Sequence, residues 1–279
     1  MPPSSTRGAA TGSVPTFLTL PERYVPKPTL VFIPTYDESE NVGPMCERLL
    51  KLELDADIVF MDDASPDGTG VVLDALARSH PEISVIHRPA KLGIGSAHLE
   101  GIAYAYDRGY RRLVTLDADF THAPEKIPAF LARAESSDVV IGSRHIGTES
   151  LPGWSVFRKA LTKLGHVLTQ RLLGMSHDAT GAFRVYNLET IPRALFDLVE
   201  SRGYAFFFES LLILYRNSFS IAEVPIKLPA RSAGHSKMSY LEIQRSVRML
   251  FELSLETQRR PERFLLDGGP RSLPPDAKA

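Results

Sequence analysis

The stretch Leu116-Asp117-Ala118-Asp119-Phe120-Thr121-His122-Ala123-Pro124-Glu125 decides how the rest of the chain is interpreted. It continues an apolar run, residues 112–116, which predicts a short buried strand. Because side chains alternate between the two faces of a strand, Asp117 and Asp119 are expected on the same face. Two neighbouring carboxylates are tolerable if a divalent cation lies between them and a polyphosphate. An alternative stays open here, in which Asp119 caps the next helix and Asp117 is solvated.

Strand and helix patterns alternate on both sides of this stretch. Apolar runs predict five strands, at residues 29–33, 58–61, 83–86, 112–116 and 138–142. Amphipathic segments between them predict helices, the last of this series at about 125–134. Such alternation over about 110 residues indicates an α/β fold with a mostly parallel, Rossmann-like sheet and helices on both faces.

Acidic or turn-forming clusters follow three of these strands. They are residues 34–38, 62–67 and 117–119. Ligands of open α/β sheets bind at the carboxyl ends of the strands, so this repetition favours a metal and nucleotide site at one sheet edge. Asp37 to Glu40 is also expected to start a helix with a capping box.

The second half of the chain is less regular. Residues 154–173 and 240–257 are typical of amphipathic helices, and the first of them is basic. Such a helix lies either on a membrane surface or on the protein's own core. The apolar segment 206–215 is too short for a membrane span and contains Glu209, so it predicts a buried helix. A strand at 220–226 and a polar loop at 231–239 complete the pattern.

Composition narrows the class of protein further. The chain has 32 Lys+Arg and 33 Asp+Glu residues, a net charge of −1, which argues against nucleic-acid binding. The single cysteine, Cys46, excludes an intramolecular disulfide, fits a reducing compartment and is expected to pack in a helix. We expect residues 1–28 and 267–279 to be disordered tails, with no signal peptide.

Several further motifs occur in a fixed order along the chain. They are Ile33 to Glu38, Asp62 to Thr69, Lys91 to Gly95, Asp117 to Asp119, Gly142 to Arg144, Asp178 to Arg184 and Arg231 to Ser239. Together they resemble the family 2 inverting glycosyltransferases of the GT-A type, and among these the dolichyl- or polyprenyl-phosphate mannose synthases. The resemblance makes 29–239 a GT-A glycosyltransferase domain and 240–266 a C-terminal amphipathic helical segment.

The resemblance implies a reaction and its partners. The protein is expected to transfer mannose from GDP-mannose to a polyprenyl (dolichyl-type) phosphate, with inversion and with Mg²⁺ or Mn²⁺ as cofactor. It is expected at the cytoplasmic face of a membrane, bound peripherally, with a separate membrane subunit as a possible partner. Two alternatives stay open: transfer from UDP-glucose or another UDP-sugar, and a non-catalytic nucleotide-sugar-binding subunit.

The resemblance also assigns roles to residues. On the donor side, Pro34, Tyr36 and Glu38 would line the nucleotide pocket, and Phe60 and Asp62 would hold the base. Ribose, diphosphate and metal would meet Asp117, Ala118 and Asp119, with Thr121 near the metal. The basic residues Arg144, Arg158, Arg231 and Lys237 would hold donor and acceptor phosphates, and Asp119, Arg144 and Arg158 are the expected catalytic residues.

The chain departs from the family at a few of these motif positions. Thr121 stands where relatives often have glutamine, Asp37 where they have asparagine, and Ala64 where they have glycine. Ala182 also replaces a common glycine, and residues 207–208 replace a stretch that often carries glutamine. These departures concern the metal preference and the acceptor side rather than the reaction class.

Overall fold

The computed structural model describes residues 27–147, 150–154, 156–228, 240–267 and 269. Its described strands form one seven-stranded sheet in the order β3-β2-β1-β4-β6-β5-β7. The strands are β1 (Thr29–Thr35), β2 (Ala56–Asp62), β3 (Ile83–His87), β4 (Arg112–Thr115), β5 (Val139–Ser143), β6 (Arg184–Asn187) and β7 (Ile221–Pro225). All neighbours pair in parallel except β6, which is antiparallel to β4 and β5. The predicted mostly parallel sheet is confirmed.

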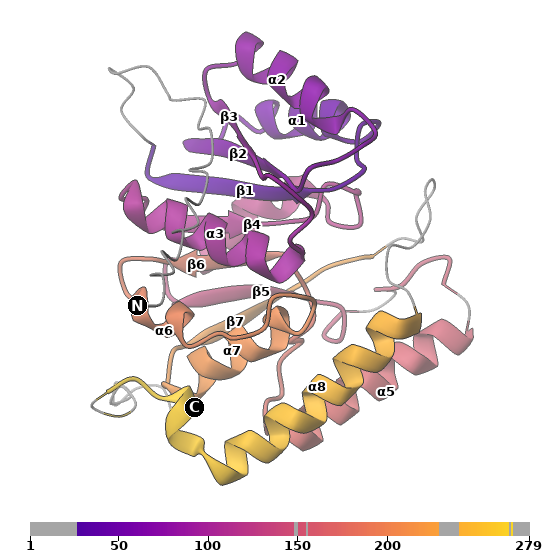
Figure 1. Cartoon of the computed structure of the whole chain (residues 1–279), viewed down its shortest axis with the longest axis vertical. Coiled ribbons are helices and arrows are strands. Elements are labelled where there is room, and N and C mark those ends of the chain that lie inside the picture. Colours follow the sequence, from indigo (N-terminus) through magenta and orange to yellow (C-terminus); the bar gives the residue numbers. More distant parts are fainter. Residues whose placement is uncertain (1–26, 148–149, 155, 229–239, 268, 270–279) are drawn as a thin grey trace, which may run out of the picture.

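Helices cover both faces of this sheet (Figure 1). One face carries α1 (Val42–Leu50), α2 (Thr69–Ser79), the short η1 (Pro124–Lys126) and α4 (Ile127–Arg133). The other carries α3 (Ile94–Asp107), α6 (Ala194–Asp197) and α7 (Phe206–Arg216). Beyond α7, the long helices α5 (Val156–Leu173) and α8 (Tyr240–Arg259) lie side by side at one end of the molecule, and η2 (Pro261–Phe264) follows α8.

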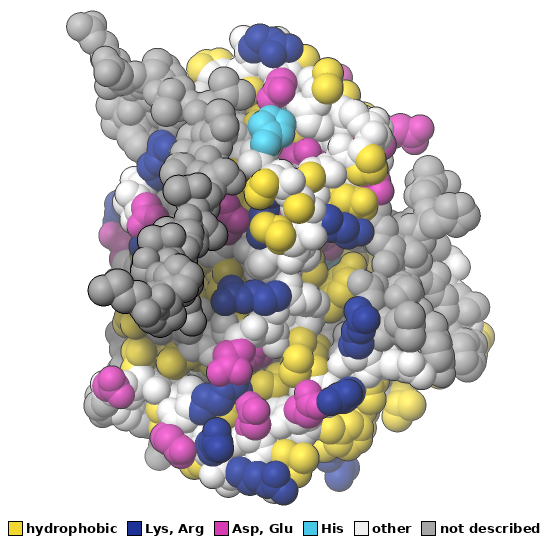
Figure 2. All heavy atoms as spheres, viewed as in Figure 1, with side chains coloured by type: hydrophobic (Ala, Val, Ile, Leu, Met, Phe, Trp, Pro, Cys, Tyr) yellow, Lys and Arg dark blue, Asp and Glu magenta, His cyan; other side chains and the backbone are white. Residues whose placement is uncertain are grey.

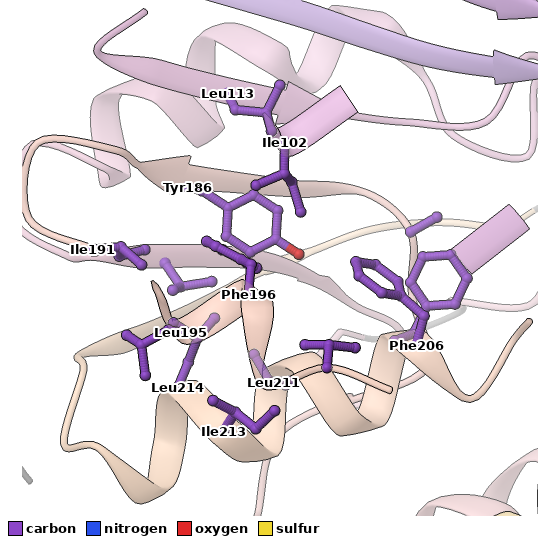
Figure 3. Close-up of a cluster of buried hydrophobic side chains, with 14 of the residues drawn as sticks. Ile102, Leu113, Tyr186, Ile191, Leu195, Phe196, Phe206, Leu211, Ile213 and Leu214 are labelled. Atoms are coloured by element: carbon purple, nitrogen blue, oxygen red, sulfur yellow. The ribbon is translucent and has the colours of Figure 1, made fainter. Parts of the chain in front are cut away.

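Strand β1 shows why the sheet has two hydrophobic layers. Leu30 and Phe32 point into the core on the α3 side, whereas Val31 and Ile33 point into the core on the α1 side. Figure 3 shows part of the first layer, where Phe196 of α6 lies against Tyr186 of β6. Every residue of β1 is buried, as expected of a central parallel strand covered on both faces.

The end of α8 is fastened to the core by the residues that follow it. Phe264 has no exposed surface, and Asn217 at the end of α7 donates to its carbonyl at 2.7 Å. Arg263 donates to the buried carboxylate of Glu209 on α7 at 2.8 Å. The segment after α8 is therefore part of the folded domain rather than an appendage.

The structure confirms two element predictions and corrects one. Residues 206–215 form a buried helix, and Cys46 packs in α1 with 1% of its surface exposed. The expected capping box at residues 37–40 does not form, because α1 begins at Val42 after Asn41 without a side-chain cap. Within the described residues, we find no helix with the length and apolarity needed to span a bilayer.

Candidate active site

The carboxyl ends of β1, β2, β4 and β5 lie at the same edge of the sheet, because these strands run in the same direction. The residues predicted to bind the nucleotide-sugar donor and the phosphate groups come directly after the carboxyl ends of these strands. The topology therefore brings together motifs that are more than one hundred residues apart in the sequence, from Tyr36 to Arg144.

The opening stretch forms a loop after β4, which ends at Thr115. Asp117 and Asp119 are partly exposed while Leu116 and Ala118 are buried, so burial alternates as expected of extended chain. Asp119 does not cap a helix, since the next helical element begins at Pro124 after Ala123. Instead its Oδ1 accepts hydrogen bonds from the Thr121 amide at 3.0 Å and the Thr121 hydroxyl at 2.6 Å. The capping alternative is thus wrong.

The donor set of this loop suits a magnesium or manganese ion. Two carboxylates and a hydroxyl supply only oxygen atoms, the ligands that hard divalent cations prefer. Across the described residues, no group of three or more His, Cys, Asp or Glu side chains is placed to hold a metal by itself. A site of one or two carboxylates that is completed by substrate phosphates fits both observations.

Neighbouring elements hold the acidic loop in place. Arg48 of α1 lies over the Phe120 ring, 5.0 Å from its centroid, and forms a bidentate ion pair with Glu125. On the inner side, His122 is 5% exposed and its ring lies 5.6 Å from that of Phe183. Its Nδ1 accepts from the Asp117 amide at 3.4 Å. The loop is therefore anchored on both sides of its two carboxylates.

Hydrogen bonds connect the loops after β1 and β2, where the nucleotide is predicted to bind. The amides of Asp37, Glu38 and Ser39 donate to Ser65, Thr69 and Asp67 respectively, at 2.9–3.0 Å. Burial opposes ionisation of Asp67, but hydrogen bonds from Thr69 and Ser39 lower its pKa to about 2. The polar residues at 37–39 thus join two loops instead of starting a helix.

The structure places the predicted base-binding residues at different depths. Asp62 is 4% exposed, and its carboxylate accepts from the Ser65 hydroxyl at 2.5 Å. The Phe60 ring lies in the hydrophobic core with no exposed surface, so its side chain does not reach the site. Pro34 is also buried, whereas Tyr36 and Glu38 are partly exposed.

A buried ion pair that sequence reasoning missed positions the loop before α3. Arg88 donates to Asp63 at 2.7 Å, and Asp63 also accepts the amides of Leu92 and Gly93, each at 2.9 Å. This loop carries Lys91, whose Nζ lies 3.6 Å from the centroid of the Tyr36 ring. The signal was present as a second aspartate after β2 and an arginine after β3, but only the fold pairs them.

Arg144 lies at the end of β5 and is held by Asp178. Its Nε donates to Asp178 Oδ2 at 2.8 Å and its Nη2 to the Thr180 hydroxyl at 2.8 Å. The Asp178 side chain is 1% exposed, and this burial disfavours its charged form. The neighbouring Arg144 guanidinium outweighs the effect of burial and holds the pKa of the carboxyl below its usual value. Asp178 therefore orients Arg144.

A second arginine shapes the loop that contains Asp178. Arg184 is fully buried and donates to the carbonyls of Ala179 and Gly181, both at 2.8 Å, and of Phe207 at 2.7 Å. Its charge is satisfied by backbone oxygens, which ties the 178–184 motif to α7. Arg184 is a structural residue that keeps Asp178 in place.

Three of the predicted phosphate-binding side chains are not placed by the structure. Arg231 and Lys237 lie outside the described residues, and the Arg158 side chain does too, although its backbone belongs to α5. The sequence showed that this helix is basic but gave no site role to Lys159 and Lys163. In the structure both border the pocket next to Arg144, together with His145 and with His166 of α5.

A mostly parallel sheet with an acidic loop after the central strand β4 and a basic group at the end of β5 is the arrangement of a glycosyltransferase of the GT-A type. Residues 30–191 match the family described as glycosyl transferase family 2. The chain belongs to this family, as its motifs predicted.

Two relatives and one solved structure illustrate the similarity. The chain is 37% identical to an undecaprenyl-phosphate mannosyltransferase from Micrococcus luteus, over 75% of this chain and 87% of that protein. It is also 37% identical to a polyprenol monophosphomannose synthase from Mycolicibacterium smegmatis, over 78% and 84%. Glucosyl-3-phosphoglycerate synthase from Mycobacterium tuberculosis, solved with Mn²⁺, uridine diphosphate and phosphoglyceric acid, shares the fold with a TM-score of 0.60 at 18% identity, covering 88% of this chain and 80% of that one.

Proposed function

We propose that the protein transfers mannose from GDP-mannose to the phosphate of a polyprenyl phosphate, with inversion at the anomeric carbon. Both relatives described above are named for mannosyl transfer to a polyprenyl phosphate or for polyprenol monophosphomannose synthesis. The observation that carries the proposal is a division of charge along one sheet edge. Asp117 and Asp119 lie at the end of β4, and Arg144 with the basic face of α5 lies beyond the end of β5.

This division of charge suits two anionic substrates. A phosphate monoester has a second pKa of about 6 and is largely dianionic at pH 7, so it attacks without a strong general base. What it requires is positive charge that holds it next to another anion. Arg144, pre-oriented by Asp178, donates to phosphate in a planar geometry, and Arg158 on α5 is its proposed companion.

On the donor side, Tyr36 and Glu38 border the nucleotide, and Asp62 accepts hydrogen bonds from the base. Asp117 and Asp119, with Thr121, would hold Mg²⁺ or Mn²⁺, and the Ala118 backbone lies between them. When bound, this ion neutralises charge that develops on the departing nucleotide diphosphate. Arg231 and Lys237 are proposed as further phosphate ligands. The Phe60 ring is buried in the hydrophobic core, so the proposal gives the base contact to Asp62 alone.

We also propose peripheral association with the cytoplasmic face of a membrane, which a polyprenyl acceptor requires. The exposed apolar side chains of α5 and α8, such as Leu164 and Phe251, support this location. A separate membrane subunit is a further possible partner of the same surface.

The experiment incubates purified protein with GDP-mannose, Mg²⁺ or Mn²⁺ and a polyprenyl phosphate. We expect a mannolipid with inverted anomeric configuration, identified by mass spectrometry and NMR. UDP-glucose replacing GDP-mannose as the only accepted donor would overturn the mannose assignment. An Asp119→Asn protein that keeps full turnover would contradict the roles given to the acidic loop and favour a different site or a non-catalytic subunit.

A further inference from the structure

A pocket of about 380 Å³ lies between the end of β5 and helix α5. Its α5 wall consists of residues spaced by three and four positions, which form one face of the helix. Those residues are Lys159, Thr162, Lys163, His166, Val167 and Gln170. The opposite wall includes Arg144, His145 and Leu151. The pocket therefore joins the arginine of the proposed site to one face of α5.

The charged side chains that line this pocket are all positive. Arg144, Lys159 and Lys163 are cations, and none of the described residues that line the pocket is acidic. Asp178 lies behind Arg144 and engages its Nε and Nη2, so it offsets only one of the three charges. The remaining positive charge matches a dianion such as a phosphate monoester.

Two stacked imidazoles supply further hydrogen-bonding groups to the same pocket. The rings of His145 and His166 lie 3.8 Å apart between centroids, with an interplanar angle of 11°. Burial lowers the pKa of His145, helped by His166 and Arg144 and opposed by Asp178 and Glu223. A neutral imidazole donates one N–H, and the lysines Lys159 and Lys163 face the same space.

One side of the pocket is apolar and leads outward. Leu151 and Val167 line it, and Val167 and Leu164 are exposed on α5, Leu164 by 62%. A ligand with a charged head in the pocket can therefore lay an apolar chain along the outer side of α5. Inorganic phosphate would use the basic wall but not this apolar path.

We propose that this pocket binds the phosphate end of the acceptor, that Lys163 and His166 recognise the phosphate, and that Val167 and Leu164 contact the first isoprene units. The inference rests on the proposed function for the identity of the ligand, a prenyl phosphate monoester. It adds to Arg144 and Arg158 a set of residues further along α5 that select for a dianionic head with an apolar tail.

The test measures the binding of farnesyl phosphate, a short soluble prenyl phosphate, by calorimetry, together with steady-state kinetics. Lys163→Gln should raise the Kd and the acceptor KM about five- to twentyfold, because a charge-assisted hydrogen bond to phosphate is lost. The Kd for GDP and the KM for GDP-mannose should stay unchanged. Lys51→Gln, which removes an exposed charge at the end of α1, is the matched control and should leave all four constants unchanged.

Further variants separate the head from the tail. His166→Phe keeps an aromatic ring against His145 but lacks the N–H, so it should weaken farnesyl phosphate binding severalfold, and His166→Gln should restore part of it. Leu164→Ser should weaken farnesyl phosphate but leave the binding of inorganic phosphate unchanged. Because Lys163 and Leu164 are exposed, these variants are expected to fold.

The outcomes distinguish this inference from the proposed function. If Lys163→Gln and His166→Phe bind farnesyl phosphate as tightly as the unmodified protein, the pocket assignment is overturned even when mannosyl transfer occurs. If no mannosyl transfer occurs but both variants bind farnesyl phosphate more weakly, the pocket assignment is supported and the proposed reaction fails.

Discussion

Three residues at the carboxyl ends of β1, β2 and β4 have left-handed backbone conformations. Asp37 has φ 54°, Ala64 has φ 58° and Phe120 has φ 58°. Residues with a Cβ rarely adopt this region, and aspartate and asparagine tolerate it better than alanine. Two of the sequence departures noted above, at Asp37 and Ala64, thus fall at positions with positive φ, which accords with the asparagine and glycine that the resemblance implies there.

Ala64→Gly should stabilise the protein by about 1 kcal/mol, because glycine adopts a positive φ without a steric penalty. The measurement is chemical denaturation, compared with Ala132→Gly at an exposed position of α4, which should destabilise by a similar amount. Equal destabilisation by both substitutions would contradict the assigned strain.

Thr121→Val should weaken metal binding, because the Thr121 hydroxyl donates to Asp119 Oδ1 at 2.6 Å and orients this carboxylate. Loss of such an orienting partner typically costs ten- to a hundredfold in metal affinity, and a roughly tenfold effect is expected here. Mn²⁺ binding in the presence of GDP, followed by electron paramagnetic resonance, measures it. Thr121→Ser retains the hydroxyl and should bind nearly as well; an unchanged Thr121→Val would remove Thr121 from the metal site.

At the scale of elements, α3 carries a buried residue that the proposed mechanism does not use. His98 is 1% exposed, lies against Phe206 and Phe207, and neither ring nitrogen has a hydrogen-bond partner among the described residues. Burial, with a smaller contribution from Arg184, lowers its pKa to about 3. The histidine is therefore neutral in the folded protein at any pH near neutrality.

This burial makes stability depend on pH in a defined direction. The unfolded chain binds a proton at His98 below a pKa of about 6.5, whereas the folded protein does not until the pH approaches 3, so stability falls as pH falls across this window. The loss amounts to about 2 kcal/mol at pH 5. His98→Leu should remove this component, so that the variant loses less stability than the unmodified protein between pH 7.5 and 5. His80→Gln, on the surface at the end of α2, should keep the full dependence in urea titrations at both pH values.

The element patterns were predictable because burial imposes them locally. Apolar runs marked β1, β2, β3 and β5, and the apolar segment 206–215 marked α7. The helix start predicted at residues 37–40 is wrong, because the amides of residues 37–39 donate to the segment after β2. That contact joins segments about thirty residues apart, which periodicity does not encode. For the same reason Asp63–Arg88 and Arg144–Asp178 could not be paired from the sequence. The sequence locates the motifs of the site, but it does not show which carboxylate pairs with which arginine.

For the molecule as a whole, the helix pair α5 and α8 carries most of the exposed large hydrophobic side chains among the described residues. Val247, Phe251 and Leu255 recur every four residues on α8 and are 41–48% exposed. Exposed basic residues occur on the same two helices, Arg245 and Arg248 on α8 and Lys163 and Arg171 on α5, with Arg248 paired to Glu252. Figure 2 shows hydrophobic side chains among charged ones over the end of the molecule that α8 covers. This combination is typical of helices that lie in the plane of an anionic membrane surface.

We predict that the protein sediments with vesicles of phosphatidylcholine and phosphatidylglycerol, and does so less at high salt, because exposed basic residues contribute to attraction. The double variant Val247→Ser, Phe251→Ser should reduce the partition coefficient about tenfold or more, since each apolar side chain contributes about 1.5–3 kcal/mol when buried. Val71→Ser, on α2 and 73% exposed, removes an apolar side chain at the other end of the molecule and should leave binding unchanged. Because the acceptor's chain would leave the pocket beside Leu164, a protein that ignores these vesicles, or a double variant that binds them normally, would require another surface to face the lipid.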